Sequence, residues 1–219
     1  MVVLASPGRP DQLMNGSGKL RLISGRRLLS PRGSATRPTT ARVREAVMNI
    51  VRPRLMDCRW LDLCSGSGVM ACEAIERGAR SVTAVERDPR CASICKRNLE
   101  AVATSHAAQT KVKVVKRDVL LWLQQDWQES GFDLIYFDPP YDGGLYQKTL
   151  ALLGKQPWLE PDGLLICEHR SGQPPSPGED WTVVDQRRYG TSSLVLISRR
   201  ERCHRDGIDS RQPRTIQEA

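Results

Sequence analysis

The chain has 219 residues, 39% of them hydrophobic, and a formal net charge of +8, which suits one domain of ordinary size with additional segments. It has no apolar run long enough to cross a bilayer and no secretion signal at its start, so we expect a cytoplasmic protein without membrane contact. Its seven cysteines lack paired C-x-x-C spacing and only three histidines are present, which disfavours a metal site and predicts free thiols.

Two polar segments flank the region in which we expect ordered structure. Residues 1–18 are rich in Gly, Ser, Pro and Asn, and residues 199–219 are almost free of large apolar side chains, so both are predicted to be unordered tails. Residues 19–54 are predicted to form a basic N-terminal extension made of a short hairpin and a helix. Residues 55–198 are predicted to form the main domain.

The N-terminal extension carries eight bases and no acid over residues 19–44. A hairpin is expected around Ser24-Gly25, and a helix follows because Thr39 or Thr40 can cap its first turn and apolar residues recur at helical spacing. Clustered cations attract phosphate backbones, although a solubilising arm is the alternative. We predict a surface that contacts RNA or DNA through Arg26, Arg27, Arg32, Arg37 and Arg42.

Strand and helix patterns alternate through the main domain. The predicted strands cover residues 59–64, 81–86, 111–118, 132–137, 163–169, 181–190 and 191–199. The predicted helices cover residues 69–78, 88–103, 119–125 and 145–155. This alternation predicts an α/β fold, Rossmann-like and doubly wound, with a mostly parallel seven-stranded sheet that ends in an antiparallel hairpin. Ligands bind such sheets at the carboxyl ends of the strands, so the informative residues are those at which each strand ends.

The first predicted strand ends in a glycine loop. Gly66, Gly68 and Ala71 have the G-x-G-x-x-A spacing, and Glu86 ends the second strand twenty residues beyond Gly66. Glycines let the backbone approach a ligand closely, and the carboxylate can accept hydrogen bonds from both ribose hydroxyls. This pattern would serve either NAD or S-adenosyl-L-methionine.

The carboxylate of Asp62, just before the glycine loop, helps to separate these two ligands. It would repel a pyrophosphate, but it is favourable beside the ammonium or sulfonium of S-adenosyl-L-methionine. A structural role, in which loop amides satisfy Asp62, is the alternative and is compatible with the first. The predicted donor-binding residues at these two strand ends are Asp62, Cys64, Ser65, Gly66, Gly68, Glu86 and Arg87.

The third predicted strand ends at Asp118-Val119. Asp118 has two interpretations that are close to even when taken alone: it can cap the following helix, or it can accept a hydrogen bond from an adenine amino group. Because the glycine loop already indicates a nucleoside, we favour the adenine contact and add Asp118 and Val119 to the predicted donor site.

The fourth predicted strand ends at Asp138-Pro139-Pro140-Tyr141. Taken alone this is a stiff turn, but D-P-P-Y is also a known signature of methyl transfer to amines conjugated with a planar system. The Asp138 carboxylate and the Pro139 carbonyl can bind the two N–H groups and aim the nitrogen lone pair at the methyl group. Pro140 stiffens the turn, and Tyr141 offers a ring on which an extruded base can stack.

The sequence resembles one specific family, the RsmD methyltransferases of small-subunit 16S ribosomal RNA. The resemblance covers roughly residues 19–198 and rests on "LRLISGRRL", "RPTTARVREAVMNIV", "WLDLCSGSG", "EAIERGA", "VERD" and "FDPPY". It implies the class I methyltransferase fold and S-adenosyl-L-methionine as donor. It also implies methylation of the N2 amine of one guanine, in ribosomal RNA or the assembling small subunit.

The resemblance further implies that Arg37, Pro38, Thr39 and Thr40 pack over the donor and the target base, and that the basic N-terminal hairpin helps to hold RNA. A helix cap without ligand contact is the alternative for Thr39 and Thr40. We expect a monomer. Other interpretations remain open: the same chemistry on adenine N6 or on a protein glutamine amide, an RNA-binding protein without activity, and an NAD-dependent oxidoreductase. The run of strand-end carboxylates disfavours loss of activity, and Asp62 disfavours NAD.

Overall fold

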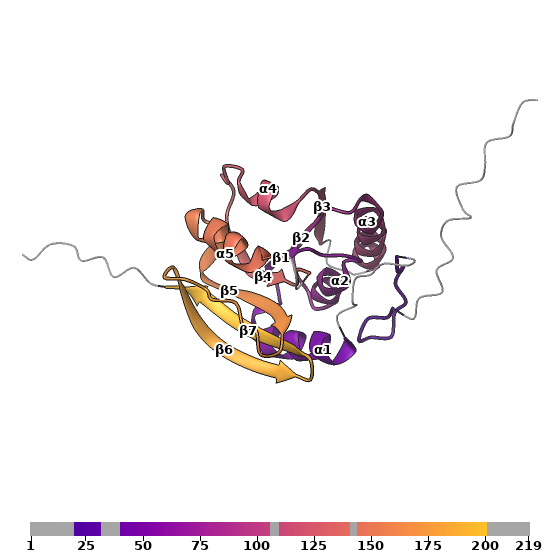
Figure 1. Cartoon of the computed structure of the whole chain (residues 1–219). Coiled ribbons are helices and arrows are strands. Elements are labelled where there is room, and N and C mark those ends of the chain that lie inside the picture. The colour runs from indigo at the N-terminus through magenta and orange to yellow at the C-terminus, as the bar shows by residue number, and fades with distance from the viewer. Residues whose placement is uncertain (1–19, 32–39, 106–109, 141–143, 201–219) are drawn as a thin grey trace, which may run out of the picture.

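A seven-stranded sheet lies at the centre of the computed structural model, which describes residues 20–31, 40–105, 110–140 and 144–200 (Figure 1). The strands are β1 (Arg59–Leu63), β2 (Ser81–Glu86), β3 (Lys111–Lys116), β4 (Phe132–Phe137), β5 (Leu159–Arg170), β6 (Trp181–Tyr189) and β7 (Ser192–Arg199). Their order is β3-β2-β1-β4-β5-β7-β6. Strand β7 is antiparallel to its neighbours β5 and β6, and the remaining pairs are parallel. The predicted fold class, with its closing hairpin, is confirmed.

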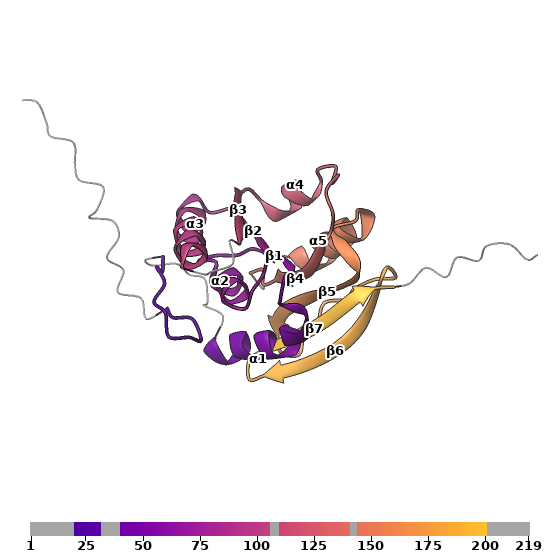
Figure 2. The same ribbon diagram turned by 180° about the vertical axis from the view of Figure 1, so that it is seen from behind.

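Helices cover both faces of the sheet. They are α1 (Ala41–Val51), the short η2 (Arg52–Arg54), α2 (Val69–Glu76), α3 (Pro89–Thr104), α4 (Val119–Leu123) and α5 (Leu145–Lys155). One buried apolar cluster joins α1, α2 and α3 to the sheet, and a second joins α4 and α5 to its other face, as Figures 1 and 2 show from opposite sides. No described helix is both long and apolar enough to span a membrane.

The first helix begins where the sequence predicts it. The Val43 N–H donates to the Thr40 hydroxyl at 3.3 Å, so Thr40 is the cap and α1 starts at the next residue. Val43, Val47 and Val51 lie on one helical face and are buried in the same cluster as residues of β5 and β7. This apolar face holds α1 against the sheet and sets the direction in which the N-terminal extension enters the domain.

The hairpin expected around Ser24-Gly25 is present as a short bridge. Leu22 N–H donates to the Arg26 carbonyl at 2.9 Å, and Leu28 N–H donates to the Leu20 carbonyl at 3.0 Å. Gly25 has a φ of 89°, a conformation that glycine adopts without strain. Leu22 and Leu28 are buried in the cluster that also contains α1, so the hairpin packs on the main domain.

Strand β5 begins earlier than predicted. The sequence places a turn at Pro161-Asp162-Gly163 before the strand, whereas the strand already pairs with β4 at Leu159, opposite Phe132. The register then shifts before Leu164, so the predicted turn is an irregularity within the strand. The predicted tail over residues 1–18 lies outside the described residues, as do residues 201–219 of the second tail.

Candidate active site

The loop after β1 brings the backbone into a tight turn. Cys64, Gly66 and Gly68 all have positive φ angles, of 62°, 54° and 76°, and the Gly68 N–H closes the loop on the Ser65 carbonyl at 2.8 Å. A β-carbon at Gly68 would lie 2.6 Å from the Cys95 sulfur. Only glycine therefore fits where α2 begins, and the loop lies close against α3.

Glu86, at the end of β2, holds the glycine loop from the side. Its Oε2 accepts the Gly66 N–H at 2.8 Å and its Oε1 accepts the Asp88 N–H at 2.8 Å. Each carboxylate oxygen has two acceptor positions, so both can take a further hydrogen bond. The side chain is half-buried, and it lies beside the loop as the spacing predicts.

Asp62 lies beneath the same loop and is 2% exposed. Its Oδ2 accepts the Ala71 N–H of α2 at 3.2 Å. Burial first, and the nearby charge of Glu86, raise the pKa of this carboxyl to about 8. A backbone amide therefore satisfies Asp62, as the structural interpretation requires, although it belongs to α2 and not to the loop. A cationic ligand beside this carboxyl group would stabilise its charged form.

Asp118 follows β3 and caps α4. Its Oδ1 accepts the N–H groups of Leu120 and Leu121 at 2.9 and 3.3 Å, so the capping interpretation holds, while contact with an adenine stays a prediction. Val119 is buried in the core beneath. Arg87, which follows Glu86, is exposed.

The predicted catalytic turn leaves the sheet beside the glycine loop. Leu63 of β1 pairs with Phe137 of β4, so the residues that follow these two strands emerge side by side. Asp138 is half-buried, Pro139 is buried and Pro140 is exposed. Tyr141 lies outside the described residues.

Four carboxylates converge on the end of β1. Burial first, and then the charges of Glu86, Asp138, Asp62 and Asp118, raise the pKa of the Cys64 thiol. These acids come from four different strand ends, and their common neighbour is the first residue of the glycine loop. We call this set the acid ring. Its field favours a positively charged ligand over a phosphate.

The acid ring does not form a metal site in the part of the chain that the structure describes. Within those residues, no three His, Cys, Asp or Glu side chains are grouped as metal ligands. The six described cysteines are free, and burial raises the pKa of Cys95 to about 12. These thiols stay protonated near neutral pH and pack as apolar side chains.

Two supporting interactions join residues that the sequence does not connect. Glu168, at the end of β5, is 3% exposed; its Oε2 accepts the Tyr136 hydroxyl and its carbonyl accepts the Tyr146 hydroxyl, each at 2.7 Å. Tyr136 lies two residues before Asp138, so Glu168 holds the strand that carries the predicted catalytic turn. A carboxylate at a fifth strand end is the one sequence signal that could have indicated it.

Asn98 of α3 joins the N-terminal extension to the glycine loop. Its Oδ1 accepts the Leu29 N–H at 2.9 Å, and its Nδ2 donates to the carbonyls of Leu29 and Ser67 at 3.0 and 2.9 Å. The side chain is 3% exposed. No sequence pattern indicates this residue, because Asn98 is an ordinary polar position on a predicted helix.

The predicted RNA-binding arginines divide into three groups. Arg26 is half-buried and its guanidinium donates to the Ala101 carbonyl at 2.6 Å, near the end of α3. Arg27 and Arg42 are exposed. Arg32 and Arg37 lie outside the described residues, as does Thr39 of the predicted donor site. Arg26 therefore anchors the hairpin within the protein, whereas Arg27 and Arg42 present their charges to the outside.

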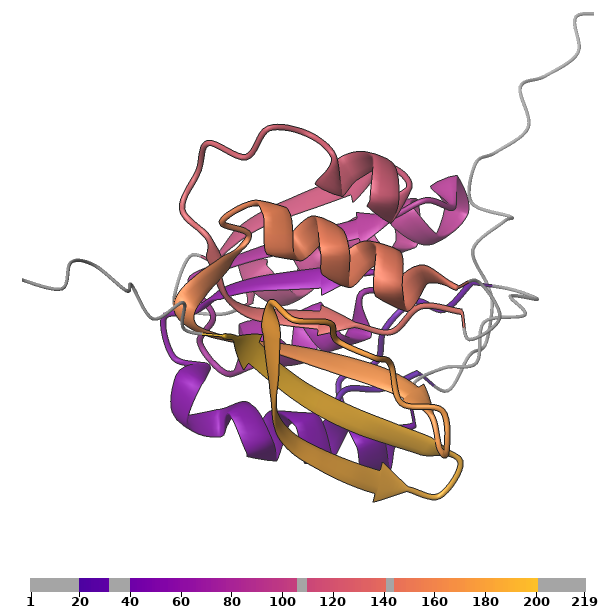
Figure 3. The same ribbon diagram turned by 60° about the vertical axis from the view of Figure 1, so that its left-hand side comes forward.

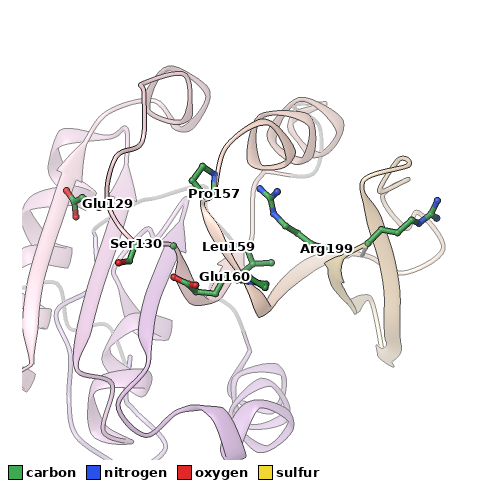
Figure 4. A pocket seen from close by; sticks show the side chains of 9 residues that line it. Glu129, Ser130, Pro157, Leu159, Glu160 and Arg199 are labelled. Carbon is green, nitrogen blue, oxygen red and sulfur yellow. The ribbon is translucent and has the colours of Figure 1, made fainter. Parts of the chain in front are cut away.

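A depression of about 530 Å³ lies at the opposite edge of the sheet. Figure 4 shows its lining, which includes Ser130 before β4, Leu159 and Glu160 at the start of β5, and Arg199 at the end of β7. No residue of the glycine loop or of the acid ring lines it. It is therefore separate from the candidate active site.

Comparisons with known proteins identify a family model, curated relatives and solved structures that are similar to this chain. Residues 17–198 match a family model described as "Conserved hypothetical protein 95". The chain is 31% identical over 189 residues to "Ribosomal RNA small subunit methyltransferase D" of Haemophilus influenzae. The alignment covers 84% of this chain and 96% of the relative. A protein of the same name from Escherichia coli is 30% identical, over 84% of this chain and 92% of the relative. The solved structure "Putative methyltransferase yhhF from Escherichia coli" superposes with a TM-score of 0.70 at 26% identity, covering 81% of this chain and 94% of that one.

Proposed function

Because the chain belongs to the RsmD family, we propose that it transfers a methyl group from S-adenosyl-L-methionine to the N2 amine of a guanine in small-subunit ribosomal RNA. The observation that carries the choice of donor is the acid ring. It joins four carboxylates around a glycine loop with two positive-φ glycines. A pyrophosphate would meet the negative charges of this ring, whereas a sulfonium or ammonium would be attracted and would favour the charged form of Asp62.

The donor's place follows from the groups around the loop. S-adenosyl-L-methionine supplies an electrophilic methyl group on a positively charged sulfur. Glu86 would accept the ribose hydroxyls through the free positions of its two oxygens, and Asp62 would face the ammonium. Asp118 and Val119 would border the adenine, with Cys64, Ser65 and Arg87 near the loop and Thr39 and Thr40 over it.

The acceptor amine would lie at the end of β4. The lone pair of an exocyclic base amine is delocalised into its ring, so the nitrogen is a weak nucleophile. The Asp138 carboxylate and the Pro139 carbonyl would accept its two N–H groups and aim the lone pair at the methyl group. Pro140 limits the motion of these acceptors, and Tyr141 would stack on the base. Positioning and electrostatics would therefore supply most of the rate enhancement.

The RNA would approach as a partly unstacked strand, since the target base must leave its stack to reach β4. The exposed cations Arg27 and Arg42 support contact with phosphates, and Arg32 and Arg37 belong to the same basic segment. We propose that the protein acts as a monomer in the cytoplasm, where bacterial ribosomes assemble, and that the reaction needs no metal.

The deciding experiment transfers labelled methyl groups to unmodified small-subunit RNA and to small subunits, and then maps the modified nucleoside. We expect N2-methylguanosine at one position. N6-methyladenosine would instead favour the adenine alternative, which uses the same strand-end chemistry. Calorimetry on the same protein should detect S-adenosyl-L-methionine but not NAD; the reverse result would exclude the proposed donor.

A further inference from the structure

The closing hairpin brings β6 to the same edge of the sheet as the candidate active site. Strand β7 runs antiparallel between β5 and β6, so β5 and β6 point the same way, as their arrowheads show in Figure 3. Arg170 of β5 and Tyr189 of β6 both pair with Ser192. The ends of β5 and β6 are therefore level with one another, and both lie beyond the end of β4.

Exposed arginines lie at the end of this hairpin that shares an edge of the sheet with the acid ring. Glu179 and Asp180 lie just before β6, at the edge away from the acid ring, and both are exposed. Arg187 and Arg188 lie at the carboxyl end of β6 and Arg170 lies at the end of β5, with β7 between the two strands, and all three are exposed. We call Arg170, Arg187 and Arg188 the hairpin rim.

Most of the rim's charge is available to a partner. Arg187 Nε is 2.7 Å from Asp185 Oδ2, so that pair is partly neutralised. Arg188 Nε donates to the carbonyl of Gly190 in its own turn, at 3.4 Å, which leaves its charge uncompensated. Among the described residues, no acidic side chain forms an ion pair with Arg170 or Arg188.

The position of the hairpin rim relative to the predicted catalytic turn follows from the strand pairing. Phe137 pairs with Cys167, so Arg170 lies three residues farther along β5. At about 3.3 Å per residue this places it roughly 10 Å beyond Phe137, on a strand about 5 Å to the side of β4. The glycine loop lies on the other side of β4, because β1 and β5 flank that strand.

We propose that the hairpin rim binds phosphates of the RNA strand next to the target nucleotide. This inference rests on the proposed methylation of ribosomal RNA. A base held at the end of β4 draws its neighbouring nucleotides across the adjacent strand ends, and the rim occupies the side that the donor does not. Guanidinium groups bind phosphate oxygens in a bidentate manner. The RNA is thus held by the N-terminal extension and by the closing hairpin, on two separate parts of the chain.

The test compares two double variants that each lose two positive charges. Arg170→Ala with Arg188→Ala removes the unpaired charges of the rim. Lys111→Ala with Lys155→Ala is the control, because both lysines are exposed and lie at the opposite edge, at the start of β3 and the end of α5. Binding of unmodified small-subunit RNA, made by transcription in vitro, is measured over a series of salt concentrations together with donor affinity.

We expect the rim variant to bind RNA several-fold more weakly. The slope of log K against log salt should become shallower by about 1.4, since each phosphate contact on a single strand contributes about 0.7. The control should keep the wild-type slope, and Arg170→Lys with Arg188→Lys should keep most of the binding. Donor affinity should be equal in all variants, which shows that each is folded.

Equal RNA binding by the rim and control variants would overturn the inference. A rim variant with the wild-type salt slope would do the same. These results differ from failure of the proposed function, in which the wild-type protein itself neither binds nor methylates the RNA.

Discussion

At the scale of one residue, the buried carboxyl group of Asp62 lowers the stability of the folded protein when it is charged. Burial and Glu86 raise the pKa of its carboxyl to about 8, whereas in an unfolded chain an aspartate titrates near pH ~4. Between these values the folded protein holds a proton that the unfolded chain has released. The free energy of unfolding therefore falls as the pH rises from about 4 to about 8.

Asp62→Asn tests both the stability cost of this carboxyl group and its proposed role in donor binding. Asparagine keeps an oxygen that can accept the Ala71 N–H, but it carries no charge. We expect the free energy of unfolding, measured by urea titration above about pH 8, to rise by about 1 kcal/mol or more. Donor affinity of the wild type should increase from about pH 6 to about pH 7.5, as the carboxylate forms, and this increase should vanish in the variant. A pH-independent wild-type affinity would contradict the assigned role.

Asp138 can be tested separately from the donor site. Asp138→Ala removes the predicted acceptor of the amine, so we expect methyl transfer at saturating donor and RNA to fall by about 100-fold or more. Donor affinity should fall much less than turnover, because the other three carboxylates of the acid ring remain. Asp133→Ala, at the other end of β4 where Asp133 pairs with Arg59, is the control and should keep its turnover. Undiminished transfer by Asp138→Ala would exclude the role.

At the scale of elements, two buried side chains hold the extension against the glycine loop and the helix that follows it. Asn98 bridges Leu29 and Ser67. Glu73 of α2, which is 0% exposed, accepts the Ile23 N–H at 2.9 Å and pairs with Arg77 at 2.8 Å. Because α2 begins at the glycine loop, both interactions connect the basic hairpin to the segment that forms the predicted donor site.

Asn98→Ala should show this connection. The substitution leaves the Ser67 carbonyl and both backbone groups of Leu29 without their partner, so we expect the free energy of unfolding to fall by about 1–3 kcal/mol. Donor affinity, measured well below the melting temperature, should also fall several-fold because the loop loses its support. Asn49→Ala, at an exposed position of α1, is the matched control. Unchanged donor affinity in a destabilised Asn98→Ala protein would limit Asn98 to a role in folding.

The elements themselves could be predicted from local patterns. The helix cap, predicted at Thr39 or Thr40, the glycine loop and the strands other than β5 each depend on neighbouring residues, and they appear close to where the sequence places them. The early start of β5 was not predictable, because it depends on pairing between Leu159 and Phe132. The same holds for Asn98, which is 69 residues from Leu29 and 31 from Ser67. Such pairs are decided by strand order and helix packing, which local periodicity does not encode.

At the scale of the whole molecule, the basic extension and the sheet share one core. Leu22, Leu28, Val43, Val47 and Met48 are buried in the same apolar cluster as Ile75 of α2 and Ile166 of β5. The boundary predicted near residue 54 therefore divides a basic segment from the rest of the sequence, but both segments share one hydrophobic core. This shared core fixes the position of the extension on the sheet, as its proposed contact with RNA requires.

A chain that begins at Leu55 should consequently fail to fold. Burying each of these five side chains contributes about 1.5–3 kcal/mol, so their loss removes about 10 kcal/mol, comparable to the whole stability of a typical domain of about 5–15 kcal/mol. We expect no cooperative thermal transition by circular dichroism. A chain that begins at Lys19 is the control. A cooperative transition near that of the full chain would show that the main domain is independent.

The acid ring also has a consequence for the end of the catalytic cycle. Its four carboxylates attract a ligand in proportion to the positive charge that the ligand carries. The proposed donor has a sulfonium charge and its demethylated product does not, so we expect the ring to favour the donor over the product by this one charge. We therefore expect these carboxylates to reduce inhibition by the product, relative to a site that lacks them.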